Sequence, residues 1–62
     1  MNSKDLLTER DIAYIALRFT VEDYLDNRDD PALGPLVLNR LRGRVAELAR
    51  LDTAIEEVLR RG

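Results

Sequence analysis

The densest group of side chains that could carry out chemistry is an acidic run near the middle of the chain, Asp26-Asn27-Arg28-Asp29-Asp30. Carboxylate and amide oxygens are the ligands that Mg²⁺ and Ca²⁺ prefer. The spacing is not that of an EF-hand loop, and the glycine that the sharp turn of such a loop requires is missing. We therefore interpret the run as a solvated acidic loop and expect no metal site.

Groups for nucleophilic or acid–base catalysis are scarce. The 62 residues include no His and no Cys, so the commonest general base and the thiolate nucleophile are both missing. The hydroxyl side chains of Ser3, Thr8, Thr20 and Thr53 have no histidine to activate them. No glycine-rich loop that would cradle a phosphate is present either. The composition predicts a protein that is not an enzyme and that needs no cofactor.

Arginines gather in Arg40-Leu41-Arg42-Gly43-Arg44, with Arg50 following. Guanidinium groups bind phosphates bidentately, so this region makes a nucleic-acid-binding regulator the alternative function. On a helix, however, Arg40 and Arg44 share a side from which Arg42 and Arg50 point away. The chain has a net charge of −2 and a pI of about 5.0, which does not favour nucleic acid as the partner. A solvated helix surface is the preferred interpretation.

Backbone signals predict one domain over residues 1–62, built from two helices. Thr8 and Asp11 form a capping-box pattern flanked by Leu7 and Ile12, which predicts a first helix over about 9–27, although Ser3 offers an earlier start. Turn-forming residues fill 28–34. A second helix follows over about 35–61, with Pro35 at its first position. A further capping pattern at 52–56 leaves a third helix open, but one continuous helix is preferred.

Both predicted helices carry wide apolar arcs. In the first helix, one apolar side runs its whole length and a second, nearly opposite, is confined to the first half. In the second helix, the step of 3 and 4 predicts a seam formed by Leu38, Leu41, Val45, Leu48, Asp52, Ile55 and Leu59. A second row lies beside this seam and consists of residues spaced seven apart, Val37, Arg44, Leu51 and Val58. One partner helix cannot cover either arc completely, so each arc calls for a second neighbour.

Acidic and basic side chains are segregated along the sequence. Five carboxylates crowd residues 22–30, while four arginines, Arg40, Arg42, Arg44 and Arg50, occupy residues 40–50. An antiparallel hairpin would bring these two regions close together, so we expect mutual neutralisation of their charges.

The resulting expectation is an all-α antiparallel two-helix hairpin that dimerises into a four-helix bundle. A core below about 70 residues rarely stabilises a chain that has neither disulfides nor a metal, and a dimer buries both arcs. Inside the hairpin, Leu17, Val21 and Tyr24 are expected to pack on Leu41, Val45 and Leu48. The intersubunit core is expected to consist of Ile12, Ile15, Phe19, Val37, Leu51 and Val58. The open alternatives are a larger assembly, a complex with a larger protein, and a monomer with a folded-back third helix.

The sequence therefore predicts a small non-enzymatic protein–protein interaction module, such as an adaptor, an inhibitor or a regulatory subunit. Residues 1–5 show no apolar signal core, so no export signal is expected. No run approaches the roughly 18 apolar residues of a membrane-spanning helix. A cytoplasmic protein with no membrane contact is the expectation.

Overall fold

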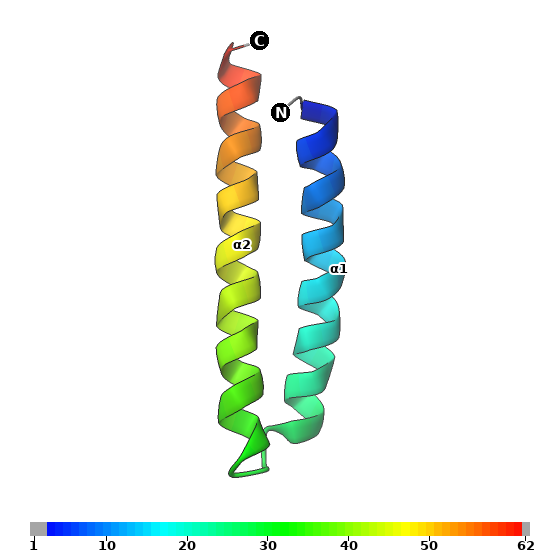
Figure 1. Cartoon of the computed structure of the whole chain (residues 1–62), viewed down its shortest axis with the longest axis vertical. Coiled ribbons are helices and arrows are strands. Elements are labelled where there is room, and N and C mark those ends of the chain that lie inside the picture. Colours follow the sequence, from blue (N-terminus) through cyan, green and yellow to red (C-terminus); the bar gives the residue numbers. More distant parts are fainter. Residues whose placement is uncertain (1–2, 62) are drawn as a thin grey trace.

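The computed structural model describes residues 3–61, which form two long helices. Helix α1 spans Ser3–Asn27 and helix α2 spans Leu33–Arg61. They run antiparallel and are joined by a short turn (Figure 1). The rod measures 48 × 14 × 13 Å. The predicted all-α hairpin is confirmed, and α2 is continuous through Asp52 and Thr53. Within the described part of the chain, neither helix is long and apolar enough to cross a bilayer.

Helix α1 begins at Ser3 and not at the predicted cap, Thr8. The Thr8 hydroxyl donates a hydrogen bond to the carbonyl oxygen of Lys4 at 3.1 Å, as a threonine inside a helix does. The earlier start extends α1 along the far end of α2. It places Leu6 in the contact between the helices, where only 7% of this residue is exposed. Burial of Leu6 therefore favours the longer helix over the local capping signal.

The turn is built on Asp30. Its Oδ1 accepts hydrogen bonds from the backbone N–H groups of Ala32 at 2.8 Å and Leu33 at 2.9 Å, which is the N-cap arrangement. Pro31 follows the cap, where a missing N–H costs no helical hydrogen bond. Helix α2 therefore begins before Pro35, and the turn covers 28–32 instead of the predicted 28–34. The two N–H groups stabilise the ionised carboxylate and lower the pKa of Asp30 below its ordinary value.

Replacing Asp30 with Ala is expected to lower the melting temperature by about 5 °C, because two N–H groups of α2 lose their acceptor. Asp30→Asn is the matched control, since the amide oxygen accepts the same bonds without titrating. Because folding lowers the pKa of Asp30, its stabilisation is complete above the ordinary pKa and disappears as pH falls through the lowered value. Thermal melts at equal protein concentration, compared at neutral and acidic pH, check this. Equal melting of wild type and Asp30→Ala at neutral pH would contradict it.

Two contacts fix the register of the helices. Arg10 Nη1 lies 3.8 Å from Asp52 Oδ1, and Gly34 lies against the carbonyl oxygens of Asn27 and Arg28. In this register Leu6 is level with Ile55. The contact between the helices, which we call the seam, has one row from α1 and one from α2, and its members are buried or half-buried. Its apolar members are Leu6, Ala13, Leu17, Tyr24, Val37, Leu41, Leu48, Leu51, Ile55 and Val58.

The seam shares Leu41, Leu48 and Ile55 with the row of α2 that the sequence predicts, but a different flank of α2 completes it. Val37 is buried against α1, whereas Val45, expected in this contact, is 52% exposed. Val21 of α1 is likewise exposed. Gly34 touches α1, and the residues that follow Gly34 at steps of seven are the shared ones, so α2 is rotated about this common line toward Val37 and away from Val45.

The two glycines of α2 have contrasting surroundings. A Cβ on Gly34 would lie 3.0 Å from each of the carbonyl oxygens of Asn27 and Arg28, whereas a Cβ on Gly43 would meet nothing within 4 Å. We expect Gly43→Ala to stabilise the protein by up to about 1 kcal/mol, through helix propensity alone. Gly34→Ala is expected to cost about 1–2 kcal/mol, because backbone must move to admit the methyl group. Urea unfolding of both variants measures the contrast, and equal effects would refute the close approach at Gly34.

The expected neutralisation between residues 22–30 and the arginines of α2 is not found. Within residues 3–61, none of these carboxylates lies within 4.0 Å of a guanidinium nitrogen of Arg40, Arg42, Arg44 or Arg50. Arg44 instead pairs with Glu47 on its own helix at 3.5 Å. Glu22 is level with Arg40 in this register, but it lies on the outer side of α1, where it lines a hollow with Ile15 and Phe19. The other four carboxylates lie nearer the turn than the arginines do. Glu56 and Arg60 of α2 form a further ion pair at 3.9 Å.

Candidate protein-interaction surface

The hairpin exposes more surface than a compact protein of its size. A compact monomer of 7.1 kDa is expected to expose about 4,100 Å², whereas this chain exposes 4968 Å². The excess of about 900 Å² is close to the roughly 800 Å² that each partner buries in a standard protein interface. The additional exposed surface of the hairpin is therefore large enough for one protein interface of standard size.

An apolar face spans both helices on one side of the seam. We call it the tyrosine face. On α1, Leu7, Tyr14 and Val21 follow one another at steps of seven, and on α2, Val45 and Leu59 lie seven residues either side of Asp52. All of its large apolar side chains are between 38% and 69% exposed. Its members are Leu7, Tyr14, Val21, Leu25, Val45 and Leu59.

The two halves of the tyrosine face lie on the same side of the hairpin. Tyr14 and Asp52 line one shallow hollow between the helices, together with Arg10, Asp11 and Leu48. The Arg10–Asp52 ion pair crosses this hollow, and about half of each side chain is exposed. Asp52 thus lies at the edge of the seam in contact with water, as the preferred interpretation of the sequence expects. The tyrosine face is consequently an apolar strip with one charged pair near its centre.

A second apolar group lies on the side of α1 opposite the tyrosine face. Ile12, Ile15 and Phe19 are more than half exposed, and Ile12 also borders the groove that Glu47 and Leu51 of α2 line. Their spacing of three and four residues places them in one stripe, which we call the outer stripe. Ile15 and Phe19 line a small hollow of ≈ 120 Å³ with Arg18 and Glu22. This stripe is shorter than the tyrosine face and belongs to one helix only.

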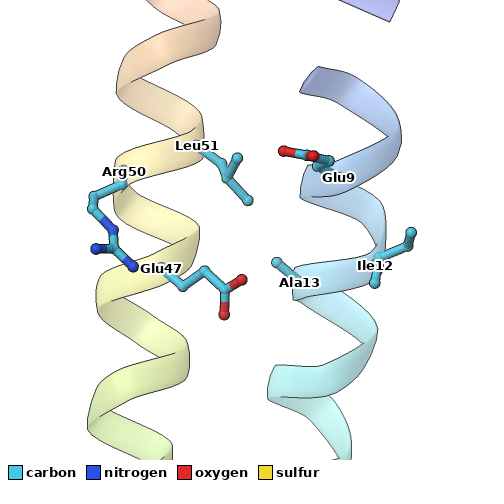
Figure 2. Close-up of a pocket in the computed structure, with 6 residues that line it drawn as sticks. All are labelled: Glu9, Ile12, Ala13, Glu47, Arg50 and Leu51. Carbon is cyan, nitrogen blue, oxygen red and sulfur yellow. The ribbon is translucent and has the colours of Figure 1, made fainter. Parts of the chain in front are cut away.

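A groove lies on the opposite side of the seam from Tyr14. Glu9 and Glu47 extend their carboxylates toward each other from the two helices, with Ala13 and Leu51 between them (Figure 2). The groove is open and measures ≈ 510 Å³. Glu47 is already engaged by Arg44. Among the described residues, no three His, Cys, Asp or Glu side chains come together in a way that could hold a metal ion.

The six residues predicted to form the intersubunit core divide into two groups. Ile12, Ile15 and Phe19 are exposed together in the outer stripe, whereas Val37 is buried in the seam. Leu51 and Val58 are half-buried in the same seam. The structure therefore does not bring all six to one surface. The sequence analysis did not predict the tyrosine face because it placed Val21 and Val45 in the contact between the two helices of one hairpin. The signal for the face is the spacing of seven residues, which links Val21 to Leu7 and Tyr14 on α1 and Val45 to Leu59 through Asp52 on α2.

The arginines considered for nucleic-acid binding do not form one patch. Arg40 and Arg44 border a shallow hollow with Gly43 and Glu47. Arg50 lines the groove that contains Glu9 and Glu47. Each group of arginines therefore has a carboxylate beside it, which weakens the attraction for a phosphate backbone.

Comparison with known proteins adds no assignment, since no protein-family model, no curated protein and no solved structure matches this chain. The largest surfaces available for recognition are thus the tyrosine face and the outer stripe. Both are apolar, and the hollows in them are shallow or small. Such surfaces suit the binding of another protein better than that of a small molecule, which is usually held in a concave pocket.

Proposed function

We propose that this chain is a non-enzymatic protein–protein interaction module that self-associates as a homodimer. Two hairpins pack their tyrosine faces together and form a four-helix bundle. The observation that carries the proposal is the exposure of six large apolar side chains along one face that spans both helices. Exposed apolar patches of this kind on small soluble proteins mark interaction sites.

The thin core of the hairpin supports the same proposal. Only Leu6, Ala13, Val37 and Ile55 are buried apolar residues within the described chain. Each large apolar side chain that moves from exposed to fully buried contributes about 1.5–3 kcal/mol. In the hairpin Tyr14, Val21 and Val45 are 53%, 38% and 52% exposed, so a dimer adds about half of this contribution for each of them in both subunits, and so supplies stability that a single hairpin of this length lacks.

The outer stripe gives the module a second surface. It lies away from the tyrosine face, so a dimer built on that face leaves Ile12, Ile15 and Phe19 exposed. Apolar residues spaced by three and four on one helix are the pattern with which helices dock into grooves of other proteins. We assign this stripe to an unlike protein partner, which would make the module an adaptor, an inhibitor or a regulatory subunit.

Sedimentation equilibrium of the purified chain tests self-association directly. The expected mass is twice the 7.1 kDa of the chain, falling toward the monomer mass on dilution. Helix content, measured by circular dichroism over the same dilution series, is expected to fall in parallel because association supports folding. A stable, fully helical monomer at every concentration would reject the homodimer.

A further inference from the structure

We infer that the two hairpins of the dimer pack antiparallel, with their turns at opposite ends and a two-fold axis passing close to Tyr14. In this arrangement α1 lies on α1 of the partner subunit, and α2 lies on its α2. The inference rests on the proposed homodimer and specifies how a second copy occupies the tyrosine face. The placement of apolar and charged residues along that face carries it.

The apolar residues of the face match themselves under this symmetry. In this arrangement, the residue n positions before Tyr14 in one subunit is level with the residue n positions after Tyr14 in the other subunit. Leu7 is then level with Val21 of the partner subunit. By the register of the hairpin, Val45 is level with Ala49 of the partner subunit, and Leu59 with Pro35 of the partner subunit. Ala49 and Pro35 are exposed but are not members of the tyrosine face, so the row of α1 around Tyr14 carries the match.

The charges along α1 match as well. Asp11 lies between Leu7 and Tyr14 at the edge of the face, and Arg18 lies between Tyr14 and Val21. With the axis at Tyr14, Asp11 comes within one residue of the level of Arg18 of the partner subunit, and symmetry repeats the pair. Arg10 is level with Arg18 of the partner subunit as well, but its guanidinium is turned toward Asp52 of its own chain, 3.8 Å away. Within one chain Asp11 and Arg18 are seven residues, or about 10 Å, apart along the helix axis, which is too far for an ion pair.

A parallel dimer, with both turns at one end, brings like charges together. It packs α1 on α2 of the partner subunit. Residues of α1 and α2 that are level with each other in one hairpin are then also level with each other across the two subunits. Arg18 is then within two residues of the level of Arg42 of the partner subunit, and Asp11 approaches Asp52 of the partner subunit in the same way. It also has two favourable pairs: Lys4 approaches Glu56 of the partner subunit near the ends of the helices, and Arg10, which is level with its own Asp52, is also level with Asp52 of the partner subunit. Juxtaposed like charges select against such an arrangement.

Charge reversal separates the two arrangements. In the antiparallel dimer, Asp11→Arg and Arg18→Asp each turn two attractions into two repulsions, so each raises the dimer Kd about tenfold. The double variant Asp11→Arg/Arg18→Asp restores the Kd to near the wild-type value. Recovery cannot come from the contact of Arg10 with Asp11 at 4.0 Å, because the double variant lacks it. In the parallel dimer, both single changes relieve repulsion, and each lowers the Kd.

Cross-linking provides a second measurement that does not depend on charge. The natural chain has no cysteine, so a single Tyr14→Cys change introduces one thiol per subunit. A short bis-maleimide is expected to join two Tyr14→Cys subunits efficiently across the axis. Val21→Cys is the matched control, since its two thiols lie about 21 Å apart along the antiparallel helices. Similar yields for the two variants are the result expected of a parallel dimer.

These experiments distinguish the inference from the proposal on which it rests. A monomeric wild type would reject the homodimer itself. A dimeric wild type without rescue by the double charge variant, and with equal cross-linking at the two positions, would overturn the antiparallel arrangement alone. Rescue together with preferential cross-linking at Tyr14→Cys supports both.

Discussion

Tyr14→Asp is expected to convert the dimer into monomers, with the dimer Kd raised by about 100-fold or more. The change removes an aromatic side chain from the centre of the proposed interface. It also places two carboxylates near the two-fold axis, where each loses water and faces the other. Sedimentation equilibrium or size-exclusion chromatography over a range of concentrations measures the effect.

Phe19→Asp is the matched control for Tyr14→Asp. Both residues are aromatic, both lie on α1, and they are similarly exposed at 63% and 53%. Phe19 belongs to the outer stripe, so its replacement is expected to leave the dimer mass unchanged. The opposite result, with Phe19→Asp monomeric and Tyr14→Asp dimeric, would reject the tyrosine face and restore the assignment of Phe19 to the intersubunit core.

Ile55→Ala is expected to destabilise the fold by about 2–4 kcal/mol, which is the usual cost of truncating a buried isoleucine. Ile55 is 8% exposed in the seam, level with Leu6. A protein of this length has only a few kcal/mol of stability to lose, so most of the cooperative unfolding transition is expected to disappear. Urea unfolding followed by circular dichroism, at one fixed protein concentration, measures the loss.

Ile12→Ala provides the control for Ile55→Ala, since it is the same substitution in a helix at a residue that is 62% exposed. Its expected cost is below about 0.5 kcal/mol, as for other surface positions. A cost as large as that of Ile55→Ala would mean that Ile12 is buried in the assembled protein, and would move the dimer interface to the outer stripe.

The sequence was sufficient to predict the helical hairpin because strong local signals define it. Turn-forming residues separate two long stretches, the first without Gly or Pro before the turn and the second without Pro after its first turn. The structure ends the helices at Asn27 and Arg61, which coincides with the predicted ranges. Signals of this kind act within a few residues and need no knowledge of the partner helix.

Features that depend on contact between the helices were not predictable in the same way. Thr8 has a good capping pattern, yet burial of Leu6 extends α1 past it. Val37 and Val45 lie on opposite flanks of the line of residues at steps of seven from Gly34, and the rotation of α2 about this line decides which flank meets α1. Both flanks are apolar, so periodicity alone does not rank them. For the same reason, the predicted interface residues were divided between the seam and the outer stripe.

For the proposed homodimer, the shallow packing of this rod would make folding depend on the abundance of the protein. No described side chain is less than 2% exposed, so we expect a solitary copy to open readily and present its backbone to proteases. Pairing as proposed would remove that vulnerability, and the fraction of copies that pair rises with concentration. We therefore expect newly made chains below the dimer Kd to be cleared faster than those above it, so that the cellular level of the protein rises more than in proportion to its synthesis.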